Sequence, residues 1–278
     1  MAYHVSAASF GRTVGGKEAA CFSITNSAGS CLEISSYGCT VKRVVLRGAG
    51  GEDRQAAAGL PTLSDYEQSP APVGAALFWE GGAALELSRS VWQVAEIGEN
   101  SVALFQKAPL PAGGTGSFAV RFAWMDRDRL VIDMSASCDR PFSPVGTSNI
   151  CFTLPGDGTG SYLLRDFCTA GTTQDQAGPS QPLDMPCDRI IHCGEHTGRL
   201  QPMAELTCPE SDLSLTAYTT AQTLHIHSVS EPFPAVRLNM GTEDAPAVIQ
   251  PGEFWNQRII YGFDAVYHGP KRILPFGM

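Results

Sequence analysis

The sequence predicts an all-β protein, built as one large sandwich of two packed sheets. Short runs in which apolar and polar residues alternate recur along most of the 278-residue chain, and this alternation is typical of half-buried strands. The chain has 29 glycines and 19 prolines but only 17% charged residues, which favours strands joined by turns over a helical bundle. So many strands must curl or split into two packed sheets.

The strand-like runs follow one another along the chain. Leu32 and Ile34 share one face of the first run, and Phe118, Val120 and Phe122 share one face of a later run. The runs cover residues 32–35, 85–97, 117–125, 129–138, 212–219, 223–230, 234–240 and 254–263. Because no change of composition marks a linker, we expect a single domain over residues 1–278.

Two segments depart from the strand pattern. Residues 63–68 predict one short helix, in which Ser64 caps the first turn. Residues 169–198 are rich in Gly, Pro, Asp and Gln and predict a long loop, a kind of segment that is often functional.

The charge and hydropathy of the chain exclude several partners. Its net charge is −9, which repels a phosphate backbone, so we expect no nucleic-acid partner. No apolar stretch approaches the ~20 residues of a membrane-spanning helix, so we expect no membrane partner. The first residues lack the pattern of a signal peptide, and we expect a cytoplasmic protein.

The cysteines predict neither a zinc site nor a redox motif. The chain has nine of them and no C-x-x-C pair. Most stand in strand-like runs, where a free thiol behaves as a small apolar group. We therefore expect reduced, buried cysteines, as in cytosolic proteins, and no metal or other cofactor.

Three groups of residues could bear chemistry. His225 and His227 share one face of a strand, where they could line a sugar pocket, hold a metal or simply cover a solvated face. Glu195 and His196 could form an acid–base couple or a structural hydrogen-bonded pair. Trp79 precedes Glu80 and two glycines, a combination that suits sugar binding but also an ordinary turn.

The order of the motifs resembles that of the galactose mutarotase (aldose 1-epimerase) superfamily. Residues 79–82, Trp-Glu-Gly-Gly, are similar to the family's L-H-G-G, and residues 147–156 are similar to T-N-H-x-Y-F-N-L-x-G. Weaker likenesses cover residues 22–46, 59–66, 91–92, 195–206, 219–227, 251–253 and 261–263.

This resemblance implies a large antiparallel two-sheet β-sandwich, called a supersandwich, with a sugar site on its concave face. It also implies anomerisation of a hexose, in which a carboxylate takes the proton of the O1 hydroxyl and an imidazolium protonates the ring oxygen. The groups that would do this are substituted. The acid His falls on Asn149, the base Glu on Asn239, a ligand-holding His on Glu80 and the family's Asp on Glu195.

Asp188 followed by Arg189 is a competing match for that Asp. The family's sugar-binding Arg block has no counterpart between Gly74 and Trp79. An asparagine side chain neither accepts the O1 proton nor protonates the ring oxygen.

Two hypotheses follow, and both have a small-molecule sugar as the ligand. The chain is either a divergent isomerase, with Glu195 and Glu80 as its catalytic pair, or a non-catalytic sugar-binding or scaffold protein that kept the fold. In both cases we expect the substrate to be held by Trp79, Asn149, His196, His225, His227 and Asn239. A homodimer is compatible with either hypothesis.

Overall fold

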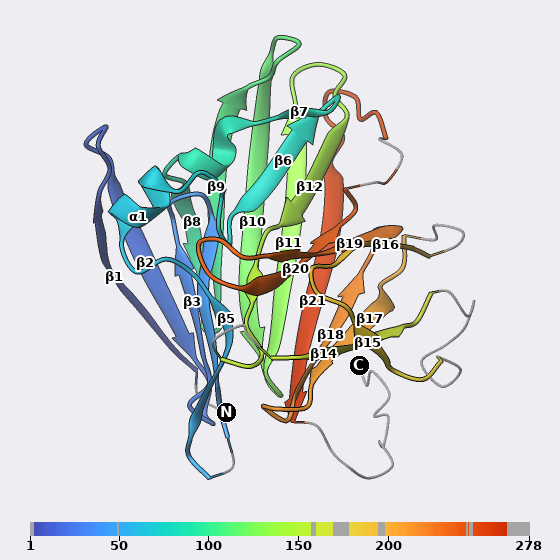
Figure 1. Cartoon of the computed structure of the whole chain (residues 1–278). Helices are drawn as coiled ribbons and strands as arrows, with labels where there is room; N and C mark the ends of the chain where they lie inside the picture. The colour runs from blue at the N-terminus through green and yellow to red at the C-terminus, as the bar shows by residue number, and fades with distance from the viewer. Residues whose placement is uncertain are drawn as a thin grey trace.

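The computed structural model describes residues 3–48, 50–156, 160–168, 178–193, 198–242, 244 and 247–265. In this part of the chain, two nine-stranded antiparallel sheets pack face to face, and a three-stranded sheet adjoins them (Figure 1). The expected all-β antiparallel sandwich is confirmed. No described helix is long and apolar enough to cross a bilayer.

The first sheet is built mainly from the N-terminal strands, and strands from three later segments complete it. Its order is β1 (His4–Arg12), β2 (Glu18–Thr25), β3 (Cys31–Ser35), β4 (Thr40–Arg47), β5 (Asp53–Ala58), β13 (Cys151–Phe152), β20 (Ala235–Met240), β19 (Thr223–Val229) and β16 (Asp188–His192). Residues far apart in sequence therefore meet around β13, β20 and β19.

The second sheet joins a central hairpin series to later strands. Its order is β15 (Gln181–Leu183), β14 (Tyr162–Asp166), β17 (Gln201–Cys208), β18 (Leu213–Thr219), β21 (Trp255–Ala265), β11 (Arg129–Cys138), β10 (Thr115–Met125), β9 (Ser101–Pro109) and β8 (Gln93–Ile97). The small sheet consists of β12 (Pro144–Ser148), β6 (Ala76–Glu80) and β7 (Ala83–Ala84), near the top of Figure 1.

The main core lies between the two large sheets. Phe118, Val120 and Phe122 are at most 1% exposed, as the alternation in β10 predicts. A second apolar cluster covers part of the outer face of the first sheet, where Leu63 and Tyr66 of the helix α1 (Leu63–Gln68) join Cys151 and Ala235. One region of this outer face is therefore apolar and covered.

Three local expectations need correction. The cap of α1 is Thr62, not Ser64, because Thr62 and Asp65 form a reciprocal capping box. Residues 85–90 are not a strand. They contain a 3₁₀-helix, η1 (Glu86–Arg89), which buries Leu87. The expected loop over residues 169–198 contains β15 and β16, which are short edge strands.

A disulfide joins the two large sheets. Cys168 follows β14 of the second sheet, Cys193 follows β16 of the first sheet, and their sulfur atoms are bonded across a sequence separation of 25 residues. The expectation of reduced thiols is wrong for this pair. The other seven cysteines are free.

Candidate functional site

Asn149 and Asn239 meet on the outer face of the first sheet. Val236 and Leu238 of β20 point into the main core, so alternation places Arg237 and Asn239 on the opposite face. Asn149 stands between β12 and β13, and its backbone N–H donates to the Ala75 carbonyl at 2.9 Å. The Asn239 amide donates to Asn149 Oδ1 at 3.3 Å.

Both asparagine side chains are nearly inaccessible, with exposed fractions of 4% and 5%. Asn149 Nδ2 donates to the Pro72 carbonyl, whereas Asn239 Oδ1 is buried and accepts no hydrogen bond. The two positions that the resemblance assigns to the acid and the base therefore lie together, and they retain one unused acceptor.

The two histidines extend this site along β19. His225 pairs with Asn239 and His227 pairs with Arg237 in the β19–β20 ladder, and the imidazole rings lie 4.8 Å apart. Asn149, His225, His227, Arg237 and Asn239 are called the polar cluster below.

His225 has a carboxylate partner. Its Nε2 lies 2.5 Å from Oδ1 of Asp188, which is on the neighbouring edge strand β16 and is largely exposed. Asp188 was the competing match for the acidic motif, and it is the acidic residue that the structure places beside the polar cluster. A histidine and a carboxylate at this distance can share or transfer a proton.

His227 is neutral at physiological pH. Burial, and then the nearby His225 and Arg237, lower its pKa from the ordinary 6.5 to about 4. Its Nδ1 is buried and has no hydrogen-bond partner, so this atom adds a second unsatisfied polar group to the cluster.

Arg237 was not among the sequence-predicted site residues. It is 6% exposed, its Nε donates to the Cys151 sulfur at 3.2 Å, and its Nη2 has no partner. No carboxylate of the described residues forms an ion pair with it. The alternation of β20 was the signal that could have found it, since a residue two positions before Asn239 must share its face.

Unpaired buried donors and acceptors are costly, at about 1–3 kcal/mol each. The polar cluster contains three such atoms, on His227, Arg237 and Asn239. A polar ligand or ordered water would satisfy them, and the cluster brings three of them together on two neighbouring strands.

Glu80 and Trp79 lie elsewhere. Trp79 and Glu80 end β6, and Gly81 and Gly82 form the hairpin turn to β7. Glu80 pairs with Pro144 at one end of the β6–β12 ladder, and Asn149 follows the other end, about five residues or ~16 Å away. The ladder therefore does not bring Glu80 beside Asn149.

Glu80 has structural partners at its own end of the ladder. Arg140 Nη2 donates to Glu80 Oε1 at 2.5 Å, and Trp79 is half-buried on the other face of β6. Glu80 also lines a cavity of about 550 Å³ beside Phe142. Glu195 and His196 lie outside the described residues, so their predicted roles stay predictions.

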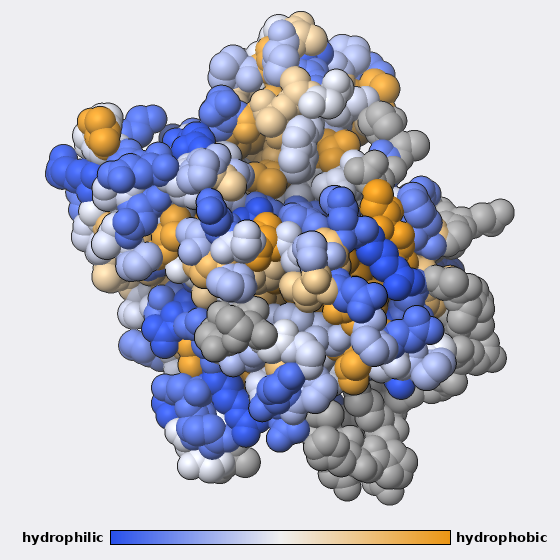
Figure 2. All heavy atoms as spheres, in the orientation of Figure 1, coloured by the Kyte–Doolittle hydropathy of each residue, from blue (hydrophilic) through white to orange (hydrophobic). Residues whose placement is uncertain are grey.

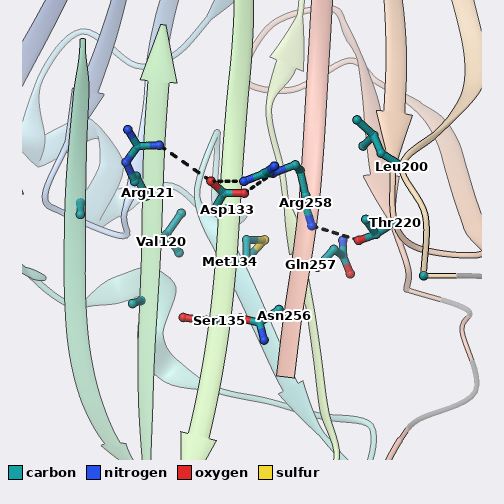
Figure 3. A pocket seen from close by; sticks show the side chains of 13 residues that line it. Val120, Arg121, Asp133, Met134, Ser135, Leu200, Thr220, Asn256, Gln257 and Arg258 are labelled. Atoms are coloured by element: carbon teal, nitrogen blue, oxygen red, sulfur yellow. Dashed lines mark hydrogen bonds and ion pairs between the residues drawn. The ribbon is translucent and has the colours of Figure 1, made fainter. Parts of the chain in front are cut away.

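A larger cavity, of about 660 Å³, lies on the outer face of the second sheet (Figure 3). Arg258 donates to both carboxylate oxygens of Asp133, at 2.6 and 3.1 Å, and Arg121 lies 3.9 Å from the same carboxylate. These charged groups are already paired with one another. The cavity therefore has fewer unpaired charged groups for a ligand than the polar cluster has.

Comparisons with known proteins identify the fold. No protein-family model matches the sequence, and no curated protein sequence matches it. Among solved structures, the galactose 1-epimerase of Lactobacillus acidophilus is 14% identical, with a TM-score of 0.74 over 96% of this chain and 100% of that one. An aldose epimerase homologue from C. elegans is 15% identical, with a TM-score of 0.70 over 87% of this chain and 98% of that one.

A galactose mutarotase-like protein from Lactobacillus casei is also similar, at 15% identity and a TM-score of 0.53, over 88% of this chain and 100% of that one. These likenesses show that the chain has the fold of the aldose 1-epimerases, as the sequence motifs imply. The chemistry of the chain depends on its own site residues, which the likenesses in fold do not determine.

Proposed function

We propose that this chain, which has the aldose 1-epimerase fold, binds a hexose at the polar cluster and has lost most or all of the anomerisation chemistry. The observation that carries the proposal is the contact between Asn149 and Asn239. The resemblance assigns the catalytic acid and base to these two positions, and in this chain both hold a neutral amide.

An amide pair suits binding better than catalysis. Anomerisation needs one group that takes a proton from O1 and another that gives a proton to the ring oxygen. Asparagine does neither, but its carbonyl accepts and its NH₂ donates hydrogen bonds. The unused Oδ1 of Asn239 can accept a hydrogen bond from a sugar hydroxyl, and the 3.3 Å contact between the amides is long enough to be exchanged for ligand contacts.

A residual isomerase is the second candidate, and one observation favours it. The 2.5 Å contact between His225 and Asp188 supplies a titratable pair beside the amides. If this pair moves the protons, His225→Gln and Asp188→Asn each abolish the activity, whereas Glu80→Gln leaves it unchanged. Glu195→Gln tests the remaining sequence-based candidate in the same assay.

The experiment measures binding and turnover on one sample. Freshly dissolved α-glucose and α-galactose are followed by NMR, with saturation-transfer difference spectra for binding and the α-to-β ratio against time for anomerisation. We expect binding with an anomerisation rate close to that of buffer. A kcat near the enzyme median of ~10 s⁻¹ would contradict the loss of catalysis.

A pair of matched variants locates the binding. Asn239→Ala is expected to abolish the saturation-transfer signal, because it removes the central amide of the polar cluster. Asn256→Ala, on the outer face of the second sheet, is expected to preserve the signal. Equal signals from both variants would place the sugar elsewhere, and thermal melting of both variants shows whether each is folded.

A further inference from the structure

We infer that the sugar bound at the polar cluster carries an acidic group, a carboxylate or a phosphate, and that the guanidinium of Arg237 binds it. This inference rests on the proposed function and names the class of sugar. It goes beyond the neutral hexose that the fold alone suggests, because it depends on a residue to which the motif comparison gives no role.

The first argument is the isolation of the Arg237 charge. The residue is only 6% exposed, and its one hydrogen bond goes to a cysteine sulfur. Arg140 and Arg165 are only partly buried, and each has a carboxylate partner. Among the described residues, Arg237 is thus a buried cation without an anion.

The second argument is that the groups next to Arg237 are uncharged. The carboxylate of Asp188 lies one strand further away, on β16, and contacts His225. Cys151, which accepts the hydrogen bond from Nε, is buried, and burial raises the pKa of its thiol. His227, the cross-strand neighbour of Arg237, is uncharged for the reason given above. An incoming anion therefore meets the guanidinium next to neutral groups, where a charge-assisted hydrogen bond is strong.

The third argument is the geometry of β20. Arg237 and Asn239 are two residues apart on one strand face, which separates their positions by ~7 Å. A hexose whose anomeric end lies at Asn149 and Asn239 extends about one ring length along the strand. C6 projects from C5, the ring carbon bonded to the ring oxygen, so an acidic group on C6 extends beyond the ring and can reach Arg237 while O1 and the ring oxygen lie at the two asparagines. A C6 carboxylate or a 6-phosphate matches this placement.

The planar guanidinium of arginine also matches the geometry of a carboxylate and of a phosphate. Arginine presents paired N–H donors that match two oxygens of a carboxylate or phosphate, and Nη2 of Arg237 has no other use. The net charge of the protein is −9, so its overall field does not attract anions. Binding of an acidic sugar must then depend on this local cation, which makes the inference specific to one residue.

The test is isothermal titration of the full chain at constant ionic strength. Glucose is compared with glucuronate, which carries the carboxylate, and with glucose 6-phosphate, which carries the phosphate. We expect one of the two acids to bind roughly 10- to 100-fold more tightly than glucose, the range of a charged hydrogen bond. The tighter acid identifies the group.

Variants assign the effect to Arg237. Arg237→Gln is expected to reduce the preference for the acid to about one, and Arg237→Lys to restore part of it, because lysine keeps the charge but loses the fork. Arg258→Gln, which removes a paired arginine from the second sheet, is expected to leave the preference unchanged. Should Arg237→Gln fail to fold, the comparison on wild-type protein decides alone.

The outcomes separate the two proposals. If glucose binds as tightly as both acids, or if Arg237→Gln keeps the preference, the present inference is wrong and the proposed function stands. If neither glucose nor the acids bind, the proposed function itself is wrong. If inorganic phosphate binds as tightly as glucose 6-phosphate, the site recognises a free anion and the inference about a sugar is overturned.

Discussion

The disulfide between Cys168 and Cys193 gives the sharpest test of the structure. It connects the end of β14, which lies next to the edge strand β15 of one sheet, to the end of the edge strand β16 of the other, so its removal unlinks the edges of the two sheets. The perturbation is the double variant Cys168→Ser with Cys193→Ser, and the reference is oxidised wild-type protein.

The magnitude follows from the length of the closed loop. For a separation of 25 residues, the chain-entropy relation says that the disulfide lowers the entropy of the unfolded state by about 12 cal/mol/K. This corresponds to about 3.5 kcal/mol of stability at 25 °C. The shift in Tm is this free energy divided by the entropy of unfolding, which is ~2.1 cal/mol/K per residue over 278 residues. Loss of the disulfide should therefore lower Tm by about 6 °C.

The assay is thermal unfolding by circular dichroism, with and without dithiothreitol. We expect the reductant to lower the Tm of wild-type protein and to leave the double variant unchanged. A thiol count in denaturant comes first, and it is expected to give seven free thiols. Cys21→Ser, which removes a free half-buried thiol, is the matched control. Nine reactive thiols, or equal melting of oxidised wild type and double variant, would refute the reasoning.

Three further predictions concern packing, titration and catalysis. Gly59→Ala is expected to destabilise the fold by about 1–3 kcal/mol, because the new methyl group would lie 2.2 Å from the Tyr66 hydroxyl; urea unfolding measures this. His227 is expected to titrate at about 4 by NMR, so the free energy of unfolding falls as pH drops from 6.5 towards 4. Asn149→His with Asn239→Glu is expected to raise the anomerisation rate about 10²-fold or more.

Each of these predictions has its own control. Gly15→Ala places a methyl group in ordinary contact only and is expected to be neutral, so equal losses at Gly15 and Gly59 would contradict the packing argument. A His227 titration near 6.5 would show that the imidazole is solvated. A wild-type anomerisation rate already typical of enzymes would remove the reason for restoring the acid and the base.

The sequence was sufficient for the fold class because strand alternation is a local property. Phe118 and Phe122 had to share a buried face whichever strands lay beside them. The order of the motifs also predicted that Asn149 and Asn239 meet, although 90 residues separate them. Alternation failed over residues 85–90, where burial of Leu87 in a 3₁₀ turn imitates a strand pattern.

The remaining features of the site depend on pairing partners, which a single sequence does not reveal. Glu80 could be matched to a motif, but only its pairing with Pro144 shows that it lies far from Asn149. Cys168 and Cys193 carry no spacing signal, since their bond requires strands of two different sheets to end side by side. Arg237 was overlooked because an arginine in a strand usually faces solvent.

The position of β21 constrains how the protein can be made. Residues 255–265 pair with β18 on one side and β11 on the other, so they join the two halves of the second sheet. During synthesis, the strands on both sides of β21 leave the ribosome before β21 does. Until β21 is made, their edges are unpaired and their apolar faces are exposed to water. A nascent chain that stops before residue 255 therefore cannot close the sheet, and the edges of β18 and β11 stay unpaired.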